Sequence, residues 1–381
     1  PEKPANLNAE AKYDYQQKYF AQAAVSRSYL NRYAPGKRWG TFYAFGLGWD
    51  ISKEAFMQSI DWVNKLKLRA VFGQTGNSIG RDNYYTWRQQ YESNAVTVAG
   101  TGAYYPQGSN YTGLYENVAV GLIETNLSLS NPNLTWERAN KLNLGLDANL
   151  FDNKLWITAD LYSDKHFDLL MTRGKSIELI GLNYPTENIG KVRYQGADLS
   201  VTYQDHIGNF NYYVTGNWSI NQSKILFMDE QNVPEEYMRR TGNPAGTRYG
   251  LIAEGFFQTR DEVANSPVIS GYNIVPGDLK YKDMNGDGVI NEYDQTAIGG
   301  NKPLCFFGLN FGFEYKGLEL SALFQGAYNR EIYFPDAGWE YATGFIAWGN
   351  TYSQAYEHVL NRWTPETAET ALFPRLSTSP N

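Results

Sequence analysis

Residues that commonly carry chemistry are scarce, because the 381-residue sequence has one cysteine and three histidines. The lone Cys305 excludes an internal disulfide and a thiolate metal cluster, and we expect it to pack as a small apolar residue near a strand start. His166, His206 and His358 have none of the spacings that metal sites require. Phosphate-loop and dinucleotide-binding motifs are also missing. The sequence therefore offers no catalytic residue, and we expect that the protein is not an enzyme.

Basic clusters and long apolar runs are missing as well. The net charge of -7, together with the lack of a basic cluster, argues against a nucleic-acid partner. No apolar run reaches the roughly 18 residues of a transmembrane helix. A β-barrel would leave no such run, because its strands carry apolar residues at alternate positions. The sequence starts at Pro1 without an initiator Met or signal peptide, so we expect a processed chain or one that begins within a longer protein.

A two-residue periodicity is clearest between positions 140 and 162. Apolar residues occupy alternate positions on both sides of a turn at 151–153, namely Leu142, Leu144, Leu146, Ala148 and Leu150 before it and Leu155, Ile157, Ala159 and Leu161 after it. Because successive side chains on a strand point to opposite faces, this pattern predicts a β-hairpin with one apolar and one polar face.

Two architectures would cover the apolar face of this hairpin. A soluble sandwich would pack it against a second sheet, with strands of about 5 to 6 residues. An outer-membrane barrel would turn it toward lipid and needs strands of about 9 to 11 residues, which the hairpin provides. Lys141, Asp147 and Asp160 on the polar face would each need a partner in a dry core, but not in a water-filled lumen. We therefore expect an all-β fold, a transmembrane antiparallel β-barrel.

The same periodicity predicts nine strands whose connections alternate in length. The strands lie within 12–27, 39–49, 65–73, 140–150, 154–162, 191–204, 212–220, 307–315 and 318–328. Short turns at 151–153, 205–208 and 316–317 alternate with long segments at 74–137, 172–189, 223–303 and 331–381. Outer-membrane barrels have short periplasmic turns, long extracellular loops and an even strand number, so nine strands indicate part of a barrel. The aromatic content of 15% fits the aromatic girdles of such a barrel.

An oxygen-rich stretch at 283–294 has the spacing of an EF-hand-like calcium loop, in which several oxygens bind a hard cation and a Gly permits the sharp turn. The expected ligands are the side chains of Asp283, Asn285, Asp287, Asn291 and Asp294 and the carbonyl of Val289. The preceding residues 277–282 are typical of extended chain rather than helix, and the last ligand is Asp instead of Glu. Two interpretations remain open, a structural Ca²⁺ site that folds the loop and an Asx-rich turn satisfied by its own backbone.

Three pairs of short motifs follow one another in an order that is typical of a known family. Arg38–Phe42 precedes Gly48–Ser52, Gly277–Asp283 leads into Asn285–Gly288, and Asn361–Glu366 precedes Phe373–Leu376. Together with the intervening hairpins, these motifs resemble the SusC-type TonB-dependent transporters of Gram-negative outer membranes. The resemblance covers most of the chain.

This resemblance implies a barrel of about 22 strands that surrounds an N-terminal plug domain. It also implies a SusD-like lipoprotein as an outer lid and a TonB complex that pulls on the plug while oligosaccharides or oligopeptides pass inward unchanged. Residues 1–381 are then expected to be barrel without the plug and the last strands, with 223–303 as a long extracellular loop that contains the metal loop, and 331–381 as another. No plug, TonB box or closing strand is recognisable, so such a fragment could not transport alone.

Two alternatives to a transporter stay open at this point. A soluble all-β carbohydrate-binding module would share the aromatic composition, and a glycan-active enzyme would need a carboxylate pair that is defined only in space. Tyr- and Asn-rich stretches at 103–106 and 109–111 offer surface for stacking on sugars or hydrogen bonding to peptides. Aromatic residues also serve in girdles and loop packing, so no substrate-contacting residue is assigned.

Overall fold

The computed structural model describes residues 3–78, 87–88, 91–93, 95–97, 104–106, 124–126, 130–174, 185–300, 302–331 and 360–375. The chain divides into two units, one made of Pro1–Gln231 and Phe306–Gly326 and the other of Asn232–Cys305 and Ala327–Asn381. Among the described residues, no helix is both long and apolar enough to span a membrane.

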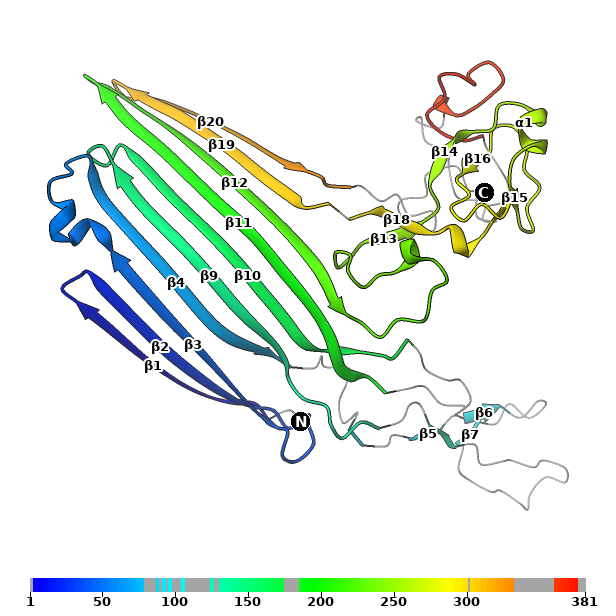
Figure 1. Ribbon diagram of the computed structural model, residues 1–381, viewed down its shortest axis with the longest axis horizontal. Helices are drawn as coiled ribbons and strands as arrows, with labels where there is room; N and C mark the ends of the chain where they lie inside the picture. Colours follow the sequence, from blue (N-terminus) through cyan, green and yellow to red (C-terminus); the bar gives the residue numbers. More distant parts are fainter. Residues whose placement is uncertain are drawn as a thin grey trace. The chain divides into compact units, whose positions relative to one another are not determined.

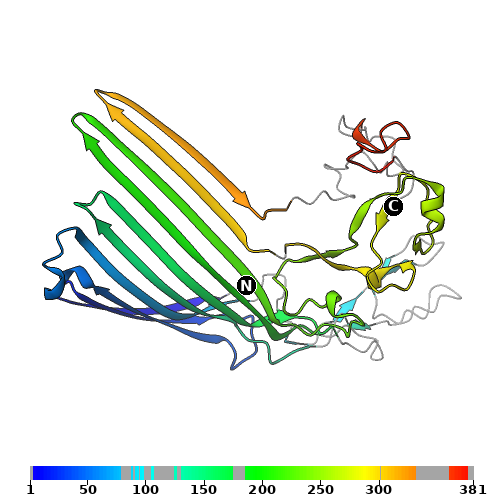
Figure 2. The same ribbon diagram turned by 45° about the horizontal axis from the view of Figure 1, so that its top comes forward.

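The first unit is built on a ten-stranded sheet whose strands follow one another in chain order (Figure 1). They are β1 (Ala5–Tyr15), β2 (Tyr19–Tyr29), β3 (Trp39–Asp50), β4 (Val63–Asn77), β9 (Glu137–Leu150), β10 (Leu155–Met171), β11 (Glu187–Ile207), β12 (Phe210–Phe227), β19 (Leu304–Tyr315) and β20 (Leu318–Tyr328). Neighbours from β1 to β12 pair antiparallel (Figure 2). β1 and β20 are the edges, so the sheet is not closed within the described residues. The predicted antiparallel all-β fold is confirmed.

Most connections of different length lie at opposite ends of this sheet, although the β3–β4 connection (51–62) at the turn end is longer than the β2–β3 connection (30–38) at the other. Because the strands are sequential and antiparallel, the turns after β1, β3, β9, β11 and β19 share one end, and the connections after β2, β4, β10 and β12 share the other. The turn end contains Phe151–Asn153 and Lys316 with Gly317, all at positive φ, which suits tight hairpins. At the other end, β5 (Tyr91–Ser93) pairs with β8 (Glu124–Asn126), and β6 (Ala95–Thr97) pairs with β7 (Tyr104–Pro106).

The prediction of nine strands is wrong, because the sequence pattern within 12–27 conceals a hairpin. The structure forms β1 and β2 there and joins them by a turn at 16–18. Gln16 and Gln17 adopt φ angles of 52° and 55°, and the Asp14 Oδ1 accepts a hydrogen bond of 2.8 Å from the Gln17 backbone N–H. Glutamine gives no turn signal comparable to Gly or Asn, so this turn was not recognisable from the sequence.

Strand register places the predicted apolar residues on one continuous face. Leu144 pairs with Ala70 on β4 and with Leu161 on β10, and residues directly opposite each other point to the same side of a sheet. Leu144 is 48% exposed and Leu161 is 58% exposed. A soluble sandwich would bury these side chains, so their exposure favours the barrel over the sandwich.

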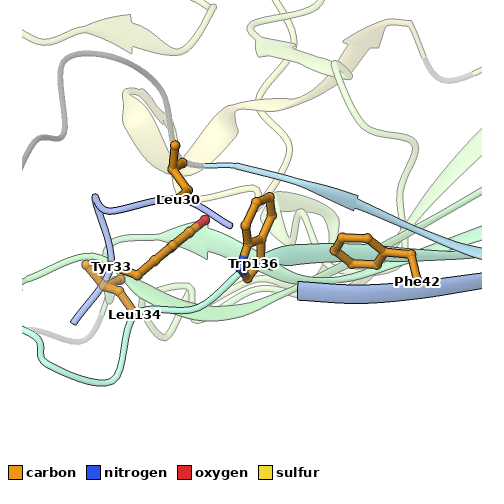
Figure 3. Packing of buried hydrophobic residues seen from close by; sticks show 5 residues of the cluster. All are labelled: Leu30, Tyr33, Phe42, Leu134 and Trp136. Carbon is orange, nitrogen blue, oxygen red and sulfur yellow. The ribbon is translucent and has the colours of Figure 1, made fainter. Parts of the chain in front are cut away.

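A small buried cluster joins the long-connection end of the sheet to the segments beside it (Figure 3). Trp136 lies between Tyr33 and Phe42, with ring centroids 5.3 Å and 5.7 Å away, and Leu30 and Leu134 flank the rings. The cluster fixes the connection after β2 against the start of β9. It is the one cluster of buried hydrophobic side chains among the described residues, so most of the apolar surface of the sheet is not packed in a protein core.

The second unit is formed by short pairs of strands. β13 (Arg248–Gly250) pairs with β18 (Thr296–Gly299), β14 (Ala253–Phe256) with β16 (Leu279–Tyr281), and β15 (Val268–Ile269) with β17 (Val289–Ile290), while α1 covers Arg260–Ala264 and the 3-10 turns η5 and η6 cover Glu236–Met238 and Glu292–Asp294. Cys305 is buried near the start of β19, as predicted.

A buried ion pair connects two of the motifs found in the sequence. The Arg375 Nε donates to Asp278 Oδ1 at 2.5 Å, and the Asp278 side chain is 1% exposed. Nearby, Gly277 has a φ of 90°, and a Cβ there would lie 2.4 Å from the Trp363 ring. The segments 277–283 and 361–376 are therefore fixed to each other where both are described.

Candidate functional site

Aromatic residues mark both ends of the apolar face. On β3, Trp39 and Trp49 share a face ten positions apart, and β2 places Tyr29 opposite Trp39 and Tyr19 opposite Trp49. Ten residues of strand span about 33 Å, and a tilt of about 40° shortens this to about 25 Å along the barrel axis. That height equals the lipid-facing band of an outer-membrane barrel, about 25 Å. The apolar face therefore has the dimensions of a membrane-spanning surface.

Charged residues pair across strands on the opposite face. Arg69 on β4 donates from Nε to Asp147 Oδ2 on β9 at 2.8 Å and from Nη2 to Asp160 Oδ2 on β10 at 3.1 Å. Gly145 leaves room for the guanidinium, because a Cβ there would lie 2.5 Å from the Arg69 Cζ. One cation thus holds two carboxylates from neighbouring strands.

The three charged residues that the sequence placed on the polar face all find partners without being buried. Lys141 pairs with Asp164 at 3.2 Å, in addition to the contacts of Asp147 and Asp160 with Arg69. The side chains of Lys141, Asp147 and Asp160 are 45%, 26% and 21% exposed. A surface that is both paired and accessible to water suits a wet lumen better than a dry core.

A shallow groove of about 450 Å³ runs over small residues on this polar face. Its lining includes Gly46 and Gly48 of β3 and Lys67 and Arg69 of β4. The Lys67 Nζ lies 3.9 Å from the centre of the Phe20 ring. Ammonium, guanidinium and aromatic groups therefore lie together on this face, an arrangement that suits contact with polar ligands.

The predicted metal loop lies in the second unit between β16 and β18. Asp283 accepts backbone hydrogen bonds from Gly286 N at 2.6 Å and from Gly288 N at 2.8 Å. These bonds, above all the one from Gly288, lower the pKa of the Asp283 carboxyl. Asn285 and Asp287 lie in the same turn, where Asn285 Oδ1 accepts from the Asp287 N–H at 3.1 Å. The structure thus brings the first three predicted ligands together.

The last predicted ligands act as caps. Asp294 is 0% exposed, and its carboxylate accepts from Met284 N at 2.8 Å and from Asn291 N at 2.9 Å. Asn291 Oδ1 accepts from Tyr293 N at 2.7 Å, which completes a capping box at η6. Within the described residues, no three His, Cys, Asp or Glu side chains converge as a metal site would require. This network is that of an Asx-rich turn, and Ca²⁺ binding stays a prediction.

The family described as "TonB dependent receptor-like, beta-barrel" matches residues 3–294. The chain belongs to this family. The SusC-like resemblance inferred from the sequence motifs is thereby confirmed. TonB-dependent receptors are proteins of the Gram-negative outer membrane, so the ten-stranded sheet is part of an outer-membrane β-barrel. Its apolar face contacts lipid and its polar face lines the lumen.

Similar proteins include several TonB-dependent receptors. TonB-dependent receptor P26 of Formosa agariphila is 28% identical over an alignment of 394 residues, and this alignment covers 97% of this chain and 36% of the receptor. TonB-dependent receptor SusC of Bacteroides thetaiotaomicron is 26% identical over 325 residues, which cover 80% of this chain and 29% of SusC. The solved RagAB peptide importer in the "open-open" state matches with a TM-score of 0.69 at 21% identity, covering 99% of this chain and 38% of that one, which shows the fold alone. The chain spans about a third of the length of the curated relatives it matches.

The structure describes only part of the Tyr- and Asn-rich stretches, and it adds Arg69 to the candidate site. Of the Tyr- and Asn-rich stretches, 104–106 form β7, whereas 103 and 109–111 lie outside the described residues. The alternation of Arg69 with Leu68 and Ala70 already indicates a polar-face position, but the sequence did not show that Asp147 and Asp160 are its partners.

Proposed function

We propose that the full-length protein containing this chain imports oligomeric nutrients, oligosaccharides or oligopeptides, across the outer membrane. The import uses energy from TonB, and a SusD-like surface lipoprotein acts as the partner that captures the substrate. The observation that carries the proposal is the sheet with two different faces, one apolar and as tall as a membrane core, the other charged, paired and wet. The names of two similar proteins, SusC and the RagAB peptide importer, support this class of function.

In this proposal the described sheet forms part of the barrel wall, and it does not modify the substrate chemically. The short turns after β1, β9, β11 and β19 face the periplasm, and the long connections, including 223–303 and 331–381, lie outside the cell. The substrate passes along the lumenal face, where the groove with Lys67 and Phe20 offers cationic and aromatic contact. Both alternatives are weaker, because a soluble binding module or enzyme would leave the apolar face of ten strands in water.

Growth and uptake of the native host would test the proposal. Deleting the full-length gene should abolish uptake of one class of fluorescent oligomer, glycan or peptide, while uptake of the monomer continues through other proteins. Loss of TonB should give the same defect, because import depends on energy from the inner membrane. The SusD-like lipoprotein of the native host should also co-purify with the tagged receptor in detergent. Normal oligomer uptake in the deletion strain, with no other defect, would contradict the proposal.

The same proposal gives the loop at 283–294 a structural Ca²⁺ ion. Its donor set consists only of oxygens, from the side chains of Asp283, Asn285, Asp287, Asn291 and Asp294 and the Val289 carbonyl, which is the chemistry that Ca²⁺ prefers. Gly286 and Gly288 adopt φ angles of 76° and 82°, as a tight loop needs. The ion would compete with backbone N–H groups for the same oxygens. We therefore expect weak binding, with a dissociation constant of about 10⁻⁴ to 10⁻³ M.

Substituting Asp283 and Asp287 by Asn should abolish this binding. The carboxylates supply the negative charge that a divalent cation needs, whereas amide oxygens are neutral. Sensitised Tb³⁺ luminescence of the full-length protein, competed by Ca²⁺, measures the loss, and Asp261→Asn in α1 is the matched control. Equal Tb³⁺ binding by all variants would disprove the site.

The pKa of Asp283 is lowered in the folded loop, so the hydrogen bonds to its carboxylate stabilise the loop above about pH 4. This stabilisation is lost as the pH falls through the lower folded pKa.

A further inference from the structure

The connection between β3 and β4 carries apolar side chains where a solvent-exposed turn would be polar. It consists of two short 3-10 turns, η1 (Ile51–Lys53) and η2 (Ala55–Met57), and continues to the start of β4. Phe56 is 63% exposed and Trp62 is 53% exposed. Large apolar side chains exposed together need an apolar or interfacial partner.

Hydrogen bonds turn this connection toward the lipid-facing side of the sheet. The Glu54 Oε1 accepts from the Tyr19 hydroxyl at 2.5 Å and from the Trp49 Nε1 at 3.0 Å, and the Lys18 Nζ donates to Glu54 Oε2 at 3.5 Å. Tyr19 and Trp49 are register partners at the turn end of the apolar face. The connection is therefore tied to the aromatic rim of the face that contacts lipid.

A second contact fixes the far end of the connection to the neighbouring turn. The Trp62 ring stacks on the Phe151 ring, with centroids 5.6 Å apart and an interplanar angle of 21°. The Phe151 N–H donates to the Trp62 carbonyl at 2.7 Å, and the Asn153 N–H donates to the Asn64 Oδ1 at 2.9 Å. Phe151 is itself 48% exposed. Trp62 and Phe151 thus form an exposed aromatic pair, and Phe56 is exposed on the same connection; these three residues are called the turn-end shelf.

We propose that the turn-end shelf is a membrane anchor that inserts Phe56 and Trp62 into the headgroup region of the periplasmic leaflet. The occupant is lipid because Glu54, which lies between η1 and η2 in the same connection, is hydrogen-bonded to Tyr19 and Trp49 at the aromatic rim of the lipid-facing side. Aromatic rings prefer that boundary, where their apolar parts leave water and polar tips stay hydrated. The inference rests on the orientation in the proposed function, with short turns on the periplasmic side. The anchor fixes the depth at which the barrel wall lies in the bilayer.

Spin labels in the full-length protein, reconstituted in phosphatidylethanolamine and phosphatidylglycerol vesicles, test the anchor. With Cys305→Ala and every other cysteine of the full-length protein replaced, single labels are placed at Phe56→Cys, Gln58→Cys, Leu144→Cys and Asn143→Cys. A 3-10 helix has about three residues per turn, so the side chains at 56 and 58 point to different sides. Gln58 is therefore a matched control. The ratio of oxygen to nickel-chelate accessibility should be severalfold higher at 56 than at 58, and Glu54→Ala should reduce that ratio by freeing the connection.

The labels at 143 and 144 separate failure of the anchor from failure of the proposed function. If position 144 is in lipid but 56 is as open to the nickel chelate as 58, the barrel stands and the anchor is wrong. If 56 is shielded from both reagents, a protein covers the shelf, and the anchor is again wrong. If 144 is not in lipid, the barrel assignment and the proposed function fail together.

Discussion

Replacing Leu144 by Arg is expected to prevent the full-length protein from accumulating as a folded outer-membrane barrel. Leu144 is 48% exposed on the apolar face, opposite Ala70 and Leu161. An Arg on the lipid-facing side of a barrel costs up to about 2 to 4 kcal/mol, the full cost being reached at the bilayer midplane. The fraction of receptor that resists urea extraction from outer-membrane preparations, and that keeps its heat-modifiable mobility in gels, measures the loss.

The neighbouring Asn143→Arg variant is the matched control for this substitution. Asn143 pairs with Val71 and Tyr162 on the polar face, so the same side chain would reach lumenal water. It should leave the inserted fraction close to that of the unchanged protein. Equal insertion of both variants, or a larger defect for Asn143→Arg, would show that the apolar face does not contact lipid.

Most of the sheet was predictable because lipid and water impose a strict two-residue period. The hairpin of β9 and β10 was found from residues such as Leu144 and Leu161, and the same reasoning located β19 and β20. The β1 and β2 hairpin was missed, since Gln16 and Gln17 form its turn without a Gly or Asn. Periodicity can thus be read from the sequence, whereas a turn without Gly or Asn cannot.

The alternation stops before a strand ends for a different physical reason. It stops at Tyr162, although the next long connection was expected only from 172, and β10 continues to Met171. Beyond the apolar band both faces of a barrel strand meet water, so the alternation that signals a strand stops while the hydrogen-bonded ladder continues. Lys165 and His166 lie in this extension, with partners on β9 and β11. Patterning therefore reports the membrane-spanning part of a strand rather than its full length.

The contacts of the candidate site could not be predicted, because they join positions far apart in the chain. Arg69 meets Asp147 and Asp160 across separations of 78 and 91 residues. The sequence placed both carboxylates on the polar face but gave no register between β4 and β9, which depends on a connection of about 60 residues. The loop at 283–294 could be recognised from the sequence, because its spacing is local and needs no register, but metal binding by its six residues stays a prediction.

Removing the cation of the buried pair in the second unit should loosen that unit strongly. The Asp278 carboxylate is 1% exposed and accepts from Arg375 Nε at 2.5 Å and from Val275 N at 2.9 Å. Arg375→Met would leave a buried charge without its cation, at a cost of about 3 to 5 kcal/mol. If the free energy of local unfolding falls by that amount, amide exchange accelerates by about a hundredfold or more. Hydrogen exchange of the full-length protein, read in peptides that cover 257–281 and 360–375, measures this effect.

Two further variants separate an unpaired buried charge from a general loss of contact. Lys280 pairs with Glu262 at 3.0 Å with both side chains about a third exposed, so Lys280→Ala should cost about 0 to 1 kcal/mol. Adding Asp278→Leu to Arg375→Met removes the stranded carboxylate and should restore much of the protection, because apolar pairs replace buried ion pairs with little loss. If Arg375→Met exchanges no faster than Lys280→Ala, or the double variant exchanges faster than the single one, the ion pair does not hold segments 277–283 and 361–376 together.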